Sequence, residues 1–141
     1  MARISRVLVS GTALIAMAVL GASATASAAD EFPTAYNTKT QRLTDKPESD
    51  MDPSCVSRRI SLIAGEYDWE QTLALGSRSN LYLGSGMYTW EDCLYPDDGF
   101  YVQQTSLNPD NPDWDTISLT DWVELDEERT YTWGSLLDPR F

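Results

Sequence analysis

The sequence contains no histidine, and this absence removes the most common arrangements for nucleophilic catalysis. Ser-His-Asp and Cys-His sites both need an imidazole to take the proton of the nucleophile. The segment Gly84-Ser85-Gly86 also lacks the spacing of a nucleophile elbow. Carboxylates are abundant, but no pair of them stands out as the acid and base of a glycosidase. We therefore expect a protein that is not an enzyme and has no catalytic residues.

Basic residues are scarce as well, since 10 Lys and Arg stand against 22 Asp and Glu, for a formal net charge of −12. Two basic residues and no acidic ones lie in residues 1–28, so the remainder carries a charge of −14. A surface for nucleic acid needs clustered Lys and Arg, and only Arg58 and Arg59 are adjacent after residue 28. The composition predicts an acidic, soluble protein with no nucleic-acid partner.

Long apolar runs are missing apart from one near the start of the chain. Residues 1–28 combine Arg3 and Arg6, an apolar run over 7–20 and the small residues Ala26-Ser27-Ala28, which is the pattern of a secretory signal peptide. No twin arginine precedes the run, and no cysteine follows it to accept a lipid. We expect a secreted, extracellular protein that is monomeric and has no membrane anchor.

Cysteine is limited to Cys55 and Cys93, and both follow the signal peptide. An even count in an exported chain predicts a disulfide, and closing this stretch restricts the unfolded chain by about 4 kcal/mol. A zinc site needs more thiolate or imidazole ligands than the chain offers. We therefore expect a Cys55–Cys93 disulfide and no metal site.

Residues 29–53 are polar and acidic without a steady apolar period, which predicts a flexible acidic arm, with a pro-segment or a tether as other interpretations. Over residues 54–141, short alternating segments are separated by Gly, Asn, Asp and Pro, the pattern of an all-β domain. Eight strands in this length predict a small antiparallel β-sandwich or barrel. The expected strands are 58–63, 66–73, 80–83, 87–94, 100–105, 116–119, 122–125 and 130–133.

A tyrosine and a tryptophan two apart, followed by a leucine four residues later, occur three times. The copies are Tyr67-Asp68-Trp69 with Leu73, Tyr88-Thr89-Trp90 with Leu94, and Tyr131-Thr132-Trp133 with Leu137. The first two copies also share the apolar segment and the glycine before the tyrosine, which predicts a degenerate hairpin repeat. A step of two places both rings on one face of a strand. We interpret most of these rings as core, with an exposed stacking platform as the alternative.

The stronger candidates for an exposed binding surface are the two tryptophans outside this repeat. Trp114 lies in the polar loop 108–115, which offers few apolar neighbours to bury it. The same loop holds three aspartates, which favour turns and also supply the oxygens that Ca²⁺ prefers, although their spacing is not that of an EF-hand. We expect no cofactor unless these aspartates bind calcium. The expected binding residues are Trp114, Trp122, Tyr95, Asp110, Asp113 and Asp115.

The segment Cys93-Leu94-Tyr95-Pro96-Asp97-Asp98 resembles the Cys-Leu-Tyr-x-Asp start of a repeat in small secreted peptidase inhibitors with a crystallin-like fold. The likeness covers these residues only and assigns no functional residue, but it implies an inhibitor as one interpretation. The main hypothesis is a secreted, non-catalytic binding module for an extracellular glycan or protein. The alternatives are an inhibitor of a secreted protease or glycosidase and a structural extracellular protein.

Overall fold

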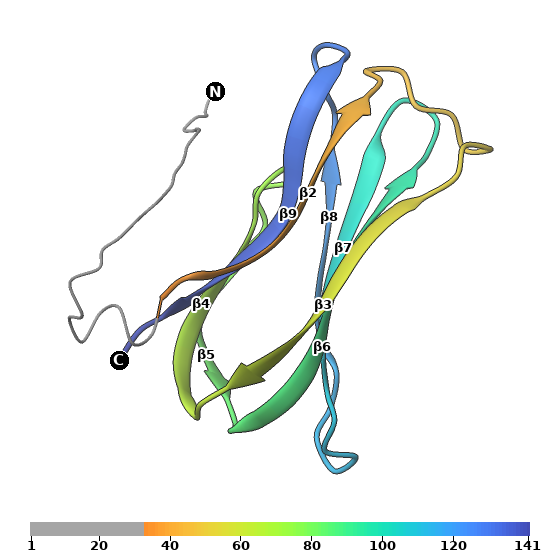
Figure 1. Cartoon of the computed structure of the whole chain (residues 1–141). Helices are drawn as coiled ribbons and strands as arrows, with labels where there is room; N and C mark the ends of the chain where they lie inside the picture. The colour runs from red at the N-terminus through yellow and green to blue at the C-terminus, as the bar shows by residue number, and fades with distance from the viewer. Residues whose placement is uncertain (1–32) are drawn as a thin grey trace. The chain divides into compact units, whose positions relative to one another are not determined.

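In a computed structural model of the chain, residues 33–141 are described, and they form two antiparallel four-stranded sheets that pack face to face (Figure 1). One sheet has the order β2-β9-β4-β5 and the other the order β3-β6-β7-β8. The all-β class and the sandwich are confirmed. The predicted signal peptide and residues 29–32 lie outside the described residues. The strands are β2 (Ala35–Leu43), β3 (Ser54–Leu62), β4 (Gly65–Gln71), β5 (Ser77–Leu83), β6 (Gly86–Pro96), β7 (Tyr101–Pro109), β8 (Ile117–Val123) and β9 (Arg129–Pro139).

Strand β2 corrects the prediction of a flexible arm over residues 29–53. It pairs with β9 along its whole length, from Ala35 opposite Leu137 to Leu43 opposite Arg129. The prediction was wrong because Asn37, a polar residue, takes a buried position of this strand and interrupts the apolar alternation. The sandwich therefore begins near residue 35 and not at residue 54.

Two further details of the strand assignment differ from expectation. The predicted strands 116–119 and 122–125 are one strand, β8, which pairs with β7 from Ile117 to Val123. Strands β3 and β6 are neighbours, and their register places Cys55 directly opposite Cys93. The predicted disulfide between these two cysteines is confirmed.

The repeated Tyr-x-Trp unit is a crossing between the sheets and not the expected hairpin. Strands β4, β6 and β9 carry the three copies, and each follows a strand of the opposite sheet. In every copy the tyrosine hydroxyl donates a hydrogen bond of 2.7 Å to the carbonyl four residues earlier, in the connection that makes the crossing. The carbonyls belong to Ile63, Gly84 and Glu127. The tyrosines thus fix three of the corners of the sandwich.

All six rings of the repeat are buried, so the interpretation as core is confirmed. The inward face of each copy continues from the two rings to a polar residue and then to the leucine. One apolar cluster surrounds Trp69 and Trp90, and a second surrounds Trp133. The polar positions lie where these two clusters meet along the strands. The inward sequences are Tyr67-Trp69-Gln71-Leu73, Tyr88-Trp90-Asp92-Leu94 and Tyr131-Trp133-Ser135-Leu137.

Candidate functional site

An exposed aromatic patch lies on the outer face of the β3-β6-β7-β8 sheet, where three strands align side by side. Tyr95 on β6 stands opposite Val102 on β7, and Val102 stands opposite Trp122 on β8. Because adjacent strands are about 4.8 Å apart, this row spans about 10 Å of the sheet. Tyr95 is 39% exposed and Trp122 is 74% exposed. We name the patch formed by Tyr95, Phe100, Val102 and Trp122 the Trp122 surface.

Phe100 completes the patch from the turn between β6 and β7. Its ring centroid lies 5.4 Å from that of Trp122, and the two ring planes are inclined by 40°. This turn is held in place, since the Asp97 amide donates to the Phe100 carbonyl at 2.8 Å. The Phe100 ring therefore supports one side of the Trp122 indole and leaves the rest of it exposed.

Two carboxylates lie at one end of this patch. Continuing the register by one step beyond the paired strands places Asp97 and Glu124 on either side of Phe100. The connections at this end of the sandwich are residues 44–53, 97–100 and 124–128, which lie together in Figure 1. They hold ten of the 22 acidic residues and one basic residue, Lys46. The Trp122 surface is thus an aromatic row beside a strongly negative end of the domain.

Trp114 and the loop 108–115 lie at the opposite end of β8, about 20 Å from Trp122 along the strand. The Trp114 ring stacks on Tyr88 at 6.5 Å between centroids and rests against Gly84, so it covers a corner of the sandwich. It is still 41% exposed. The predicted binding residues therefore divide into two separate groups: Tyr95 with Trp122, and Trp114 with the three aspartates.

One of the three aspartates of this loop is already held in an ion pair. Asp110 forms a bidentate ion pair with Arg59, with contacts of 2.5 and 3.1 Å, and this hydrogen bonding lowers the pKa of Asp110. Asp113 donates its amide to the side chain of Asn111, as in a simple turn. Within residues 33–141, the only three acidic or cysteine side chains whose ligand atoms all lie within 4.8 Å are Cys55, Glu91 and Cys93. The calcium site considered for Asp110, Asp113 and Asp115 is therefore not assembled.

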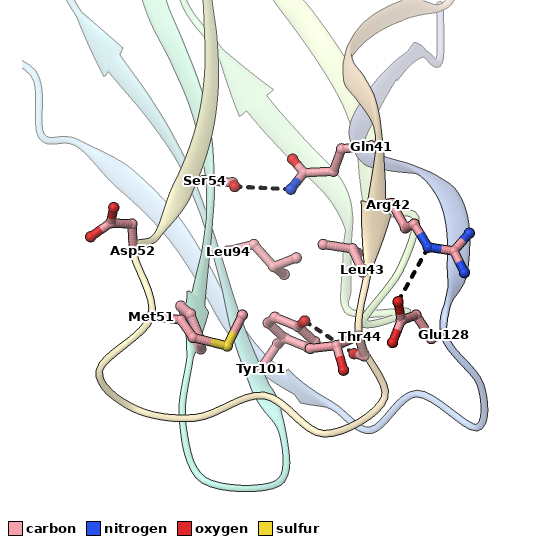
Figure 2. A pocket seen from close by; sticks show the side chains of 11 residues that line it. Gln41, Arg42, Leu43, Thr44, Met51, Asp52, Ser54, Leu94, Tyr101 and Glu128 are labelled. Carbon is pink, nitrogen blue, oxygen red and sulfur yellow. Dashed lines mark hydrogen bonds and ion pairs between the residues drawn. The ribbon is translucent and has the colours of Figure 1, made fainter.

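A pocket of about 320 Å³ opens between the edge strands β2 and β3 at the acidic end (Figure 2). Leu43, Leu94 and Tyr101 form its apolar part. Its polar groups largely satisfy one another. The interactions are Gln41 Nε2 to Ser54 Oγ at 3.0 Å, Trp133 Nε1 to Gln41 Oε1 at 3.1 Å, Arg42 to Glu128 at 3.2 Å and the Tyr101 hydroxyl to the Thr44 carbonyl at 3.1 Å.

The interior holds an acidic group that was not predicted from the sequence. Asp92 is fully buried and accepts hydrogen bonds from Asn37 at 2.8 Å, from Ser135 at 2.7 Å and from Thr105. Desolvation by burial raises the pKa of Asp92, while these neutral donors oppose that rise. Gln71 extends the network by donating to Thr105 at 3.1 Å. The sequence does contain a signal for this buried polar network, because all three copies of the repeat carry a polar residue two positions after the tryptophan.

Phe100 and Val102 are the members of the Trp122 surface that the sequence did not indicate. Neither stands in a motif, and their meeting with Trp122 depends on the pairing of β7 with β8. No protein-family model, curated protein or solved structure matches this chain. In the described part of the chain, no helix is long and apolar enough to span a membrane.

Proposed function

We propose that the protein is a secreted, non-catalytic binding module that holds an extracellular ligand against the Trp122 surface. The observation that carries this proposal is the exposure of Trp122, which is 74% accessible although it lies in a sheet. A contiguous patch of exposed aromatic rings costs solubility, and such patches are characteristic of recognition sites. The disulfide between Cys55 and Cys93 is compatible with an oxidising extracellular location.

The other two candidate surfaces support binding less well. The rings of the Tyr-x-Trp repeat are buried, so they offer no face to a ligand. The pocket between β2 and β3 has polar groups that already pair with each other, which leaves few donors to orient a bound molecule. Trp114 is partly exposed, but one of its faces is used against Tyr88.

The geometry of the patch favours a protein ligand over a polysaccharide. Successive sugar rings of an extended glycan stack best on coplanar aromatic rings, whereas Phe100 and Trp122 are inclined by 40°. Two rings inclined to each other suit a side chain of a protein better than a row of sugar rings. Binding of a glycan instead of a protein is therefore the competing result of the binding experiment described below.

An inhibitor of a secreted hydrolase is the second candidate, because the turn beside the patch is rigid. Asp98 accepts the Ser49 amide at 2.9 Å, and the Gly99 amide donates to the Pro47 carbonyl at 3.0 Å. A turn tied to a second loop in this way loses little entropy when it enters a cleft. Loss of protease or glycosidase activity at a stoichiometric ratio would support this candidate.

The test uses the secreted protein as recovered from the medium of an expressing host. Biotinylated wild type, Trp122→Ala and Trp114→Ala are applied to an array of extracellular proteins and neutral polysaccharides, and the binding constants of the hits are measured. We expect Trp122→Ala to weaken binding at least about tenfold, because an exposed aromatic anchor commonly contributes 2 kcal/mol or more, about thirtyfold in Kd. Trp114→Ala is the matched control and should bind as wild type. Equal binding by wild type and Trp122→Ala would refute the proposal.

A further inference from the structure

We propose that the Trp122 surface recognises an arginine-containing basic segment of a partner protein, with the guanidinium against the Trp122 and Phe100 rings, beside the carboxylates of Asp97 and Glu124 that flank Phe100. This inference rests on the proposed function, because it names the ligand of the same surface. Recognition of arginine requires an aromatic face, nearby carboxylates and a shortage of basic residues that would neutralise these carboxylates. The structure provides all three.

The aromatic face and the carboxylates are brought together by the register of the sheet. Tyr95, Val102 and Trp122 form one cross-strand row, and Asp97, Phe100 and Glu124 form the next. Neighbouring rows on one face of a sheet are about 7 Å apart, since each strand rises about 3.3 Å per residue. A guanidinium that lies against the indole on the side of Phe100 is therefore near Glu124, which is on the same strand as Trp122, and faces Asp97 across Phe100. Planar stacking combined with carboxylate pairing is the interaction for which arginine is suited.

The carboxylates at this end of the domain outnumber the cations that could neutralise them. Glu128 is paired with Arg42 at 3.2 Å, and Glu127 lies 3.9 Å from Arg129. No salt bridge within residues 33–141 involves Asp97 or Glu124. Asp97 accepts one backbone hydrogen bond, from Asp98 at 2.8 Å, which leaves further acceptor positions on its carboxylate. The surface is thus complementary to a positive charge.

The same domain already contains the proposed kind of contact twice. The Arg129 guanidinium lies 4.1 Å from the centroid of the Tyr131 ring, and that of Arg58 lies 5.9 Å from Trp90. Among the described residues, no arginine or lysine takes this position over Trp122. A partner's arginine would occupy it. A second copy of this chain is a poor occupant, because two molecules that each carry a charge of −14 after loss of the signal peptide repel one another.

The experiment compares short peptides of alternating glycine and one variable residue, which is arginine, lysine, citrulline or glutamate. Citrulline is the key control because it has the shape of arginine without the charge. We expect the arginine peptide to bind at least about tenfold more tightly than the citrulline peptide, and the glutamate peptide not to bind. Raising the salt from about 50 to about 500 mM should weaken the arginine complex severalfold.

Variants of the protein locate the contact. Asp97→Asn and Glu124→Gln should each weaken the arginine complex about threefold to tenfold, while Asp113→Asn, in the loop at the far end of β8, serves as the matched control and should leave it unchanged. Equal affinity for the arginine and citrulline peptides, or full affinity in the Asp97→Asn, Glu124→Gln double variant, would overturn the proposal. Sedimentation of the protein alone is measured in parallel, and self-association lost in Trp122→Ala would show that a second copy is the occupant and would also overturn it.

The outcomes separate this inference from the proposed function. A ligand from the array that needs Trp122 but binds independently of charge and salt would leave the binding function standing and refute the basic partner. If neither the array nor the peptides show binding that depends on Trp122, the binding function and the basic partner are both refuted.

Discussion

The indole N–H of Trp90 donates to Ser135 Oγ at 2.9 Å, and this bond joins the two sheets inside the sandwich. Ser135 donates in turn to Asp92 at 2.7 Å, and Asp92 lies on β6, the same strand as Trp90. Each of these residues belongs to a copy of the Tyr-x-Trp repeat. The repeat therefore supplies both the apolar core and the polar network that crosses it. Because burial raises the pKa of Asp92 at the centre of this network, we expect the stability of the domain to depend on pH.

The first prediction concerns this pH dependence. Burial raises the pKa of Asp92 above its ordinary value of 3.8, so folding favours the protonated carboxyl group. The stabilisation is complete below the ordinary value, where the group is protonated in both states, and it is lost as the pH rises through the raised pKa. We expect the contribution of Asp92 to the free energy of unfolding to fall as the pH rises from the ordinary pKa of the group to its raised pKa in the folded protein. Urea denaturation of wild type and Asp92→Asn across a series of pH values measures it.

The asparagine variant provides the comparison because its amide does not titrate. If Asp92 causes the pH dependence of stability, the difference in unfolding free energy between wild type and Asp92→Asn changes across the pH series. A constant difference would assign the pH dependence to the surface carboxylates instead. Asp92→Ala should lose about 2 to 4 kcal/mol at low pH, where the contribution of Asp92 is complete, because it leaves Asn37 and Ser135 without their acceptor, and the loss should become smaller as the pH rises.

The second prediction concerns the three tyrosine hydroxyls that fix the crossings between the sheets. Replacing Tyr67, Tyr88 or Tyr131 with phenylalanine removes a hydrogen bond of 2.7 Å to a backbone carbonyl and keeps the ring. Each change should cost about 1 kcal/mol, which lowers Tm by about 4 to 8 °C for a domain of this size. The control is Tyr82→Phe, whose ring is 66% exposed and should have no effect. Repeat variants as stable as this control would show that the hydroxyls contribute nothing.

The third prediction concerns the close approach of β2 to β9 at Gly134. This glycine has φ of +144°, and a Cβ there would overlap the backbone carbonyl of Asn37. Gly134→Ala should therefore destabilise the domain through both backbone strain and a clash. Gly86→Ala is a matched control, because Gly86 has φ of +150° with no atom near the added Cβ. Thermal unfolding should place Gly134→Ala about 1 to 3 kcal/mol below Gly86→Ala, and equal losses would mean that β2 moves aside at no cost.

Much of the fold could be predicted from the sequence, because strands β4, β6 and β9 alternate large apolar residues with polar ones and are bounded by turn residues. Strand β2 could not, since Asn37 is buried through hydrogen bonds to Asp92 and to the Val56 carbonyl, and partners from distant strands leave no local signal. The crossings were mistaken for hairpins for a related reason. A tight turn between two strands looks alike in sequence whether the second strand joins the same sheet or the opposite one.

The candidate site was predicted only in part. The exposure of Trp122 followed from its place outside the repeat, but its neighbours depend on pairing across β6, β7 and β8. Trp114 was expected to be exposed because its loop is polar. It is covered on one face because Gly84 has no side chain and lets the indole lie against the chain beside Tyr88. A glycine distant in sequence from a loop gives no indication that it will bury part of that loop.

The most direct test of the binding surface is a titration of the ¹⁵N-labelled protein with the arginine peptide, followed through the indole N–H signals of its five tryptophans in a two-dimensional NMR spectrum. Trp122→Phe and Trp114→Phe assign the two signals from tryptophans that are not fully buried. The account predicts that the Trp122 signal shifts as peptide is added, while those of Trp114 and the buried Trp69, Trp90 and Trp133 stay in place. A shift of the Trp114 signal alone, or no shift at a saturating peptide concentration, would contradict it.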